Sequence, residues 1–304
     1  MATYYNNISS QEKLIREYRL LVQDRDANGH PVDSAIEIKN PITIRFSVNR
    51  NLFADVNSLD VDIYNLAPNT YNKLFYDYYS TDRDHIRTIV LEAGYKGQEL
   101  STIFIGDMWS CYTSRQGSDI ITRIHAFMGL NAMQAQTDLT LSQISRNQIL
   151  RAAAKDMALD IDIYSGEDTQ FTRPVSLSGN SMGIIQKYSG DNAFIDNNKI
   201  KVLENQDAIQ GSVVLINDKA GLLGAPQREN ALLTVKIIFE PRIVIGQIIE
   251  IQSRIMAQFD GQYKVWGIRH EGTISDAVSG DCTTTLEMLV GSQVYGRFNV
   301  KAEQ

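Results

Sequence analysis

The chain has 304 residues, of which 43% are hydrophobic and 9% aromatic. This length allows two or three domains of about 100–200 residues each, and the apolar content argues against wholesale disorder. The 29 basic and 36 acidic residues give a formal net charge of −7. That balance argues against a general nucleic-acid binder, because such proteins draw most of their affinity from Lys and Arg at phosphates.

The sequence shows no targeting or membrane segment. Residues 1–13 lack the basic and apolar regions of a secretory signal, and no stretch reaches the roughly 18 uninterrupted apolar residues of a membrane helix. The two cysteines, Cys111 and Cys282, lie far apart in the sequence, as expected of unpaired thiols in a reducing compartment. We expect a protein made and assembled in a cytoplasm, with no membrane partner.

The N-terminal part is predicted to be an all-β domain that carries one helix, over residues 1–134. Asn69 or Thr70 can cap this helix, which runs to Tyr78. The strands are predicted from runs rich in apolar residues, several with the alternation of a half-buried strand. They span residues 17–23, 42–48, 59–64, 86–91, 103–109 and 119–127.

The middle part, residues 135–220, is predicted to be a small α+β domain. Ser142 is a plausible cap for a first helix, and a second short helix follows Gly179. Asn197-Asn198 separates two apolar runs and predicts a hairpin. The apolar residues at helical spacing in the first helix are Leu141, Ile144, Leu150, Ala153, Ala154 and Met157.

The C-terminal part, residues 221–304, is predicted to be a second small β-domain, a barrel or a sandwich. Its alternating runs supply three or four antiparallel strands. Asp260-Gly261 favours a tight hairpin, because both residues tolerate positive φ. The alternating apolar residues are Ile249 and Ile251 in one run and Thr284, Leu286 and Met288 in another.

One motif suggests an enzyme. Residues 179–183 read G-x-S-x-G, which in α/β-hydrolases places a serine on a sharp strand-to-helix turn. His270 lies downstream, which leaves a serine hydrolase using Ser181 and His270 as an alternative. Against it, the pattern arises readily by chance and the alternating βαβ units of a hydrolase are missing, so we expect Ser181 in the first turn of a capped helix. Three aspartates separate the serine from the histidine: Asp196, Asp207 and Asp260.

The remaining candidates favour no catalytic, cofactor-binding or metal site. Asp60 and Asp62 share one strand face, where solvent exposure is expected more than acid–base chemistry. The aromatic run Tyr76, Tyr78 and Tyr79 can stack on a partner or pack locally. The histidines lack metal-ligand spacing; they are His30, His85, His125 and His270.

Two groups of segments carry a resemblance to a known family. The first group contains an IYNL strand, an AGY.G turn, an IF.G strand and a G.D..T.I strand, at residues 63–66, 93–97, 103–106 and 117–124. The second group lies at residues 221–226, 239–241, 246–247, 261–265 and 270–272. In this order, the segments resemble the baseplate hub proteins of contractile-tailed bacteriophages.

The resemblance implies a structural virion protein without enzymatic activity. It implies a mainly β fold with an α+β insert, in which two tail-tube-like β-barrel domains flank the small α+β domain. Three copies are expected to form a homotrimeric ring that adapts the six-fold tail tube to the three-fold central spike and leaves a channel for DNA. Tape measure and baseplate wedge proteins are further expected partners, and a related tail-tip or tube-initiator protein remains an alternative. An acidic chain is compatible with a lumen through which DNA slides without sticking.

Overall fold

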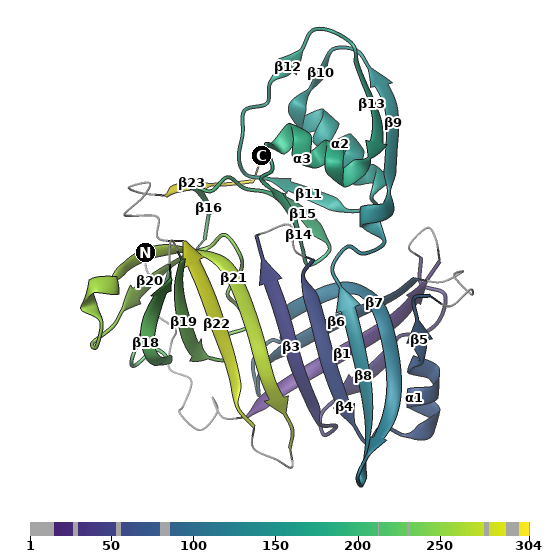
Figure 1. The fold of residues 1–304 in the computed structure, drawn as a ribbon, viewed down its shortest axis with the longest axis vertical. Helices are drawn as coiled ribbons and strands as arrows, with labels where there is room; N and C mark the ends of the chain where they lie inside the picture. Colours follow the sequence, from purple (N-terminus) through teal and green to yellow (C-terminus); the bar gives the residue numbers. More distant parts are fainter. Residues whose placement is uncertain are drawn as a thin grey trace.

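A computed structural model describes residues 15–26, 30–52, 56–79, 86–211, 213–229, 232–276, 280–289 and 298–303. The fold is mainly β, with a small α+β insert standing over the strand ends near the middle of a long sheet (Figure 1). The predicted fold class is therefore confirmed. The long sheet has 14 strands, and no pairing among the described strands joins its end strands β18 and β2 into a closed barrel.

The sheet contains two groups of strands, which we call the first and the second β unit. The first unit comprises β1 (Arg16–Arg25), β2 (Ile36–Lys39), β3 (Ile44–Asn51), β4 (Ser58–Tyr64), α1 (Pro68–Leu74), β5 (Tyr76–Asp77), β6 (Ile86–Tyr95), β7 (Ser101–Gln116) and β8 (Asp119–Phe127). The second unit comprises β17 (Val214–Asn217), β18 (Leu222–Glu229), β19 (Leu232–Ile238), β20 (Ile248–Gln252), η3 (Ala257–Phe259), β21 (Gly261–Ile274) and β22 (Cys282–Leu289).

The two units share one strand order. The pairing in the first unit runs β3-β4-β8-β7-β6-β1, and in the second unit it runs β18-β19-β22-β21-β20-β17. Read along the chain, the matched strands also follow the same sequence. The first five strands of each series pair antiparallel. The sixth strand differs, because β1 is antiparallel to β6 whereas β17 is parallel to β20.

A bulge marks the same place in both units. The pairing of β7 with β8 passes from Met108 to Ser110, so Trp109 has no partner residue in the register. The pairing of β21 with β22 passes from Val265 to Gly267 and leaves out Trp266 in the same way. A bulge inserts one extra residue and bends the strand. The only two tryptophans of the chain are thus the bulged residues of equivalent strands.

Alternation explains the strands of the long sheet. In β4, Leu59, Val61 and Ile63 are buried while Asp60 is exposed, as a strand with one wet face requires. One core lies under the first unit and continues into the insert, and a second core lies under the second unit and also includes Tyr164, Phe194 and Leu203 of the insert. Strands β3 and β4 therefore present one apolar face to a core and one more polar face outward, whereas β7 and β21 are buried on both faces over part of their length.

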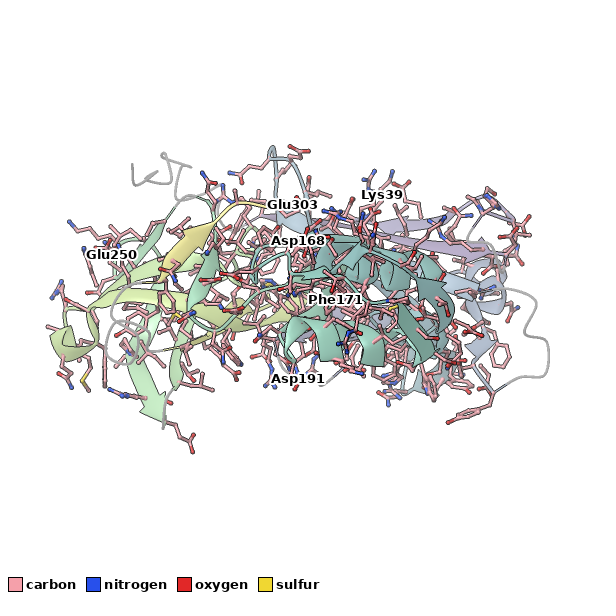
Figure 2. All side chains as sticks on the ribbon, turned by 90° about the horizontal axis from the view of Figure 1, so that it is seen from above. Lys39, Asp168, Phe171, Asp191, Glu250 and Glu303 are labelled. Atoms are coloured by element: carbon pink, nitrogen blue, oxygen red, sulfur yellow. The ribbon has the colours of Figure 1, made fainter. Side chains whose placement is uncertain are left out.

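The insert is a compact α+β module between the two units. Seen from above, its labelled side chains Asp168, Phe171 and Asp191 lie over the middle of the molecule, with Glu250 of the second unit near one end (Figure 2). Its elements are η2 (Ala132–Gln134), β9 (Gln136–Leu141), β10 (Ile144–Ser145), α2 (Arg146–Asp156), β11 (Asp160–Ile163), β12 (Gln170–Phe171), β13 (Val175–Asn180), α3 (Ser181–Ser189), β14 (Ala193–Asp196), β15 (Lys199–Val202), β16 (Asp207–Ile209) and the C-terminal β23 (Asn299–Lys301).

Two helix predictions change in detail. The cap of α2 is Ser145 and not Ser142, because Ser145 and Gln148 form a reciprocal capping box. Leu141 therefore belongs to a strand before the helix. Helix α1 starts at Pro68 and ends at Leu74, so neither Asn69 nor Thr70 caps it; Pro is favoured at the first helical position, where no N–H is needed.

The turn at Asp260-Gly261 is not the predicted tight hairpin. Ile251 pairs with Gly261, so residues 252–260 lie outside the register of β20 with β21. The Asp260 carboxylate accepts a hydrogen bond from the Ser253 N–H at 2.7 Å, which closes this longer connection. The predicted hairpin at Asn197-Asn198 is confirmed, since both residues have positive φ between β14 and β15.

Strand pairing also ties the predicted domains together. β17 lies in the sequence assigned to the middle domain and pairs with β20 of the second unit. β23 lies in the sequence assigned to the last domain and pairs with β16 at the base of the insert. Strand pairing therefore crosses the predicted boundary at residue 220 in both directions. The boundaries at residues 134 and 220 stay a prediction.

Candidate functional site

The structure gives the serine hydrolase alternative no support. Ser181 begins α3, where it is fully buried, and its hydroxyl shares a 2.8 Å hydrogen bond with that of Thr137. His270 lies in β21, also fully buried, with Nδ1 2.9 Å from the Thr284 hydroxyl. Burial lowers the pKa of His270 to about 3, with a smaller effect of Arg50. Each group is used in packing, and neither contacts the other.

The aspartates between them have other partners as well. Asp196 pairs with Arg50, and Asp207 accepts from the Ser165 hydroxyl at 2.6 Å. Asp260 closes the connection before β21. The predicted alternative to catalysis, Ser181 in the first turn of a capped helix, is confirmed, because Asn180 caps α3 by accepting from the Gly183 N–H.

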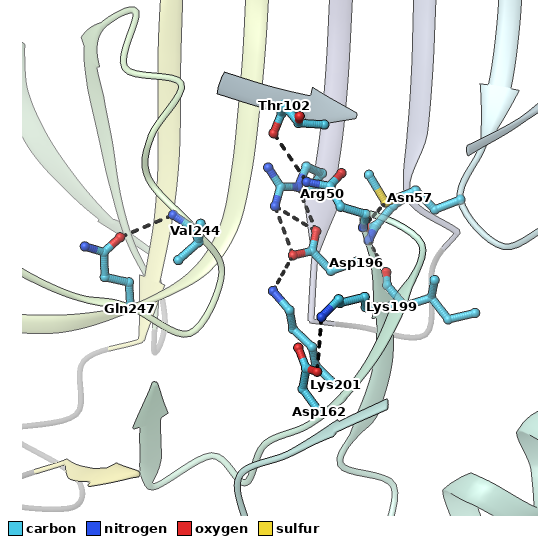
Figure 3. A network of polar contacts seen from close by, with 12 residues as sticks. Arg50, Asn57, Thr102, Asp162, Asp196, Lys199, Lys201, Val244 and Gln247 are labelled. Atoms are coloured by element: carbon cyan, nitrogen blue, oxygen red, sulfur yellow. Dashed lines mark hydrogen bonds and ion pairs between the residues drawn. The ribbon is translucent and has the colours of Figure 1, made fainter. Parts of the chain in front are cut away.

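A buried charge cluster fastens the insert to the long sheet (Figure 3). Arg50 of β3 donates through Nε and Nη2 to the Asp196 carboxylate of β14, at 2.8 and 3.0 Å. Lys201 of β15 donates to the same carboxylate at 2.8 Å. Burial alone would raise the pKa of Asp196, but the two cations hold it below its usual value. Sequence reasoning missed this cluster.

A signal for the cluster was present in the sequence. Arg50 continues the inward series Ile44, Phe46 and Val48 of β3. A charged residue at an inward position needs a buried partner, because an unpaired ion in a core is very costly. The sequence does not say where the partner lies, and Asp196 comes 146 residues later.

Equivalent positions of the two units hold the two ends of the insert. Asp107 of β7 and Lys264 of β21 each lie two residues before the bulged tryptophan. Asp107 accepts from the Asn131 N–H at 2.9 Å where the insert begins. Lys264 donates to the carbonyls of Glu204 and Asn205, at 2.7 and 3.3 Å, where the insert ends. The carboxylate of Asp107 thus accepts from an N–H group at one end of the insert, and the amino group of Lys264 donates to carbonyls at the other.

Burial changes the acidity of both residues. It raises the pKa of Asp107, against the lowering effect of the hydrogen bonds from Asn131. It lowers the pKa of Lys264 to about 7, against the raising effect of Asp207 and Glu204. Both residues therefore bear a desolvation cost, and their hydrogen bonds to the insert partly offset it.

The two units join edge to edge along a seam between β3 and β21. This seam has eight paired residues, from Asn51 opposite Gly267 to Ile44 opposite Ile274. Phe239 packs beneath it, 5.6 Å from the His270 ring, and its carbonyl accepts from the Tyr95 hydroxyl at 2.6 Å. The seam therefore makes one continuous sheet from two units (Figure 1).

Beyond the seam, several strand edges are unpaired among the described residues: besides the end strand β2 and the strand β17, these are one edge of β18 and the far half of β7. β18 pairs only with β19. The far half of β7 pairs with β8, while β5 covers only Ser110 and Cys111 on its other side. Such edges expose N–H and C=O groups that recruit further strands unless they are covered.

The polar face of the sheet carries interspersed charges of both signs. On it, Arg123 donates to Asp62 at 3.2 Å, and His125 contacts Asp60. The prediction that Asp60 and Asp62 lie on a partly exposed strand face is confirmed. The basic side chains of β3, β8, β19 and β21 on this face are Arg45, Arg123, Lys236 and Arg269. The acidic side chains of β4, β21 and β22 facing them are Asp60, Asp62, Glu271 and Glu287.

The tyrosine run is partly packed and partly exposed. Tyr78 stacks on Trp109 with ring centroids 4.6 Å apart, and Tyr79 meets the edge of the same ring. Tyr79 is nevertheless 71% exposed. His85 lies outside the described residues, within which no group of three or more His, Cys, Asp or Glu side chains is placed to hold a metal ion.

The described residues thus form an open sheet of two matched units, with unpaired strand edges and an insert fixed by buried charges, an arrangement suited to assembly with other chains. The family model described as Baseplate hub gp41 matches residues 27–276, and the chain belongs to this family. The predicted resemblance is confirmed. No curated protein sequence matches the chain.

Solved structures of low identity share the fold. A 43 kDa tail protein of prophage MuSo2 from Shewanella oneidensis superposes with a TM-score of 0.58 at 7% identity, covering 93% of this chain and 99% of the other. A tail protein from Neisseria meningitidis MC58 gives a TM-score of 0.56 at 9% identity, covering 90% and 97%. A chain of a Francisella PdpA–VgrG complex gives 0.56 at 11% identity, covering 98% of this chain and 55% of the other.

Proposed function

We propose that three copies of this chain form the hub ring of a phage baseplate, which joins the six-fold tail tube to a three-fold central spike. The observation that carries this proposal is the repeated strand order of the two β units within one sheet. Three copies then present six similar β units to the tube while the assembly keeps three-fold symmetry. The insert occurs once per chain, so its three copies match a three-fold partner.

The mixed charges on the polar face of the sheet favour its assignment to a channel for DNA. Its acidic and basic side chains are interspersed and partly paired, as in Asp62 with Arg123 and Glu271 with Lys236. A face of this kind lacks the basic stripe by which proteins hold the phosphate backbone. We place it toward the lumen, where DNA passes without being retained.

The proposed role is structural and not enzymatic. The hydroxyl of Ser181 and the ring of His270 serve packing, and we assign no catalytic, cofactor or metal site. The chain would reside in the virion, at the tail baseplate, after assembly in the host cytoplasm. Tube and spike proteins are its main partners, with tape measure and wedge proteins as further ones. Among the described residues, no helix has the length and apolar character needed to cross a membrane.

Native mass spectrometry tests the ring directly. The purified chain, alone and mixed with the tube and spike proteins of the same phage, should give a species of three times the 34.2 kDa chain mass. The spike should bind with one trimer per chain trimer. A chain that stays monomeric in every mixture and binds neither protein would overturn the proposal.

A further inference from the structure

We infer that the free edge of β7 in one copy pairs with β18 of a second copy, in the same register as the seam inside the chain. This inference rests on the proposed ring and names the surfaces that close it. Within one chain β18 and β7 lie far apart in the strand order of the sheet. The β18 strand that meets β7 must therefore come from another copy.

The equivalence of the units identifies the two strands. β7 corresponds to β21 because both carry the bulged tryptophan. β18 corresponds to β3 because each pairs with the strand that follows it, β19 or β4, and begins its unit's series. The seam joins the far half of β21 to β3. Repeating that contact joins the far half of β7 to β18.

The first unit contains a hydrogen bond equivalent to the one at the start of the seam. At the seam, the Leu52 N–H that follows β3 donates to the Trp266 carbonyl at 3.0 Å. In the first unit, the Tyr78 N–H that follows β5 donates to the Trp109 carbonyl, also at 3.0 Å. β5 therefore occupies the place of the end of β3 and leaves residues 112–116 for the incoming strand.

A groove runs along this part of β7. It has a volume of about 410 Å³ and lies between α1 and the strand, with Phe75 on one wall and Thr113 and Ser114 on the other. Phe75 and Tyr112 are 61% and 45% exposed, and their rings meet edge to face at 5.7 Å. Exposed aromatic rings beside an unpaired strand edge are typical of a protein interface.

The seam register predicts the residue pairs of the new contact. At the seam, Glu271, five residues after the bulged Trp266, lies opposite Ser47. Ser114 has the same position relative to Trp109, and Gln227 has the position of Ser47 relative to its neighbouring strand. The seam register therefore places Ser114 opposite Gln227. Tyr112 then lies opposite Glu229. Both Gln227 and Glu229 are exposed, so their side chains are available to the second copy.

The other end of β18 limits the contact. Its pairing with β19 shifts between Leu223 and Gln227, and Pro226 lies in the shift. Pro has no N–H to offer an incoming strand, and bulges end pairing at sheet edges. The contact is therefore short and covers residues 227–229. A head-to-tail contact of this kind closes into a ring or grows into a filament, and the proposed trimer requires the closed ring.

Engineered cysteines test the register. Ser114→Cys and Gln227→Cys, made in separate chains and mixed under a mild oxidant, should give a two-chain species on a denaturing gel, since opposite residues in an antiparallel pair have Cβ atoms about 4.5–5.5 Å apart. A single chain carrying both substitutions should give a cross-linked three-chain species. The native thiols Cys111 and Cys282 are buried and serve as the unreactive background.

Two matched variants control the experiment. Ser47→Cys with Glu271→Cys places the same pair at the seam and should form a bond inside one chain. Ser114→Cys mixed with Arg228→Cys shifts the pair by one residue onto opposite sheet faces and should give no bond. Bond formation at the seam without any between Ser114→Cys and Gln227→Cys, in a sample that is trimeric by native mass, would overturn the inference and leave the proposed function standing.

A charge test does not depend on cysteine chemistry. Tyr112→Glu sets a carboxylate beside Glu229 and should weaken self-assembly roughly tenfold or more, because like charges facing each other across an interface cost affinity. Adding Glu229→Lys should restore assembly. Unchanged assembly of the single variant, with trimers still formed, would contradict the predicted contact; absence of any assembly in the unaltered chain with its tube and spike proteins would instead contradict the ring.

Discussion

The two β units have the same strand order but use it differently. In the second unit, the far half of β21 is covered by β3 of the same chain. In the first unit, the equivalent half of β7 is covered only at its start, by the short β5. Equivalent buried positions also differ in sign, with Asp107 at one end of the insert and Lys264 at the other. The two units thus share a strand order, while single side chains fit each unit to a different neighbour.

The largest expected effect concerns the anchor between the first unit and the insert. Asp196→Asn leaves the buried Arg50 facing Lys201 without an anion, and we expect a loss of about 3–5 kcal/mol in the free energy of unfolding. Denaturant unfolding followed by circular dichroism measures it. The matched control is Asp62→Asn, whose partner Arg123 is partly exposed, with an expected loss within about 1 kcal/mol.

The anchor prediction has a sharper form. Replacing both partners with apolar residues, Arg50→Met with Asp196→Leu, should recover much of the loss, because the buried guanidinium is then gone. The cation that remains, Lys201, is 13% exposed and can reach water. Equal losses for Asp196→Asn and Asp62→Asn would show that the cluster does not fasten the insert.

The bulged tryptophans allow a direct comparison of the units. Trp266 is buried and Trp109 is half-buried, so Trp266→Ala should cost about 3–5 kcal/mol and Trp109→Ala clearly less. Both values come from the same unfolding experiment. A larger loss at Trp109 would mean that its stacking on Tyr78, and not burial, controls the stability at the bulge.

Lys264 gives the comparison a pH dependence. Its pKa is lowered to about 7 in the folded chain but lies near 10.4 when unfolded, so the unfolded chain binds the extra proton between these values. Stability should therefore rise with pH from about 7 to 10, by up to about 1.4 kcal/mol per pH unit from this group, and fall as the pH is lowered again. Unfolding of Lys264→Met over the same range should lose this slope; an equal slope in both chains would assign it to other groups.

The sequence predicts single elements better than contacts between them. The strand over residues 119–127 is found with the same bounds as β8, because its alternation is local. The start of α2 differs from the predicted one because Leu141 and Ile144 fit a helical period, although the Ser145–Gln148 capping box is a competing local signal. The seam and the pair of Arg50 with Asp196 join residues more than a hundred positions apart, and no local pattern encodes such a partner.

The equivalence of the two units is only suggested by the sequence. The predicted strands indicate two β units, and superposition of an experimental structure should show that the five antiparallel strands overlay while β1 and β17 run in opposite directions. A further signal in the sequence is the pair of tryptophans, each with a charged residue two positions before it, Asp107 or Lys264. Its meaning needs the register, since only the register shows that both tryptophans are bulged.

The smallest effect on stability, with a measurable effect on binding, is expected on the polar face. The triple variant Asp60→Asn, Asp62→Asn, Glu271→Gln removes the partners of His125, Arg123 and Lys236, and partly exposed pairs of this kind contribute about 0–1 kcal/mol each. Basic residues left without acids should then retain double-stranded DNA weakly, with a Kd on the order of 10⁻⁴–10⁻⁶ M that weakens as salt is raised. Fluorescence anisotropy of a labelled duplex measures this binding.

A control with the same net charge separates the face from the whole chain. Asp156→Asn, Asp160→Asn and Glu167→Gln remove three negative charges from exposed side chains of the insert, away from the polar face of the sheet. If charge on the polar face decides whether DNA is retained, this variant should bind the duplex no better than the unaltered chain. Equal binding by both triple variants would mean that net charge alone controls the retention of DNA. The polar face would then lose its assignment to the lumen, because a lumen lining must act through the charges that the DNA passes.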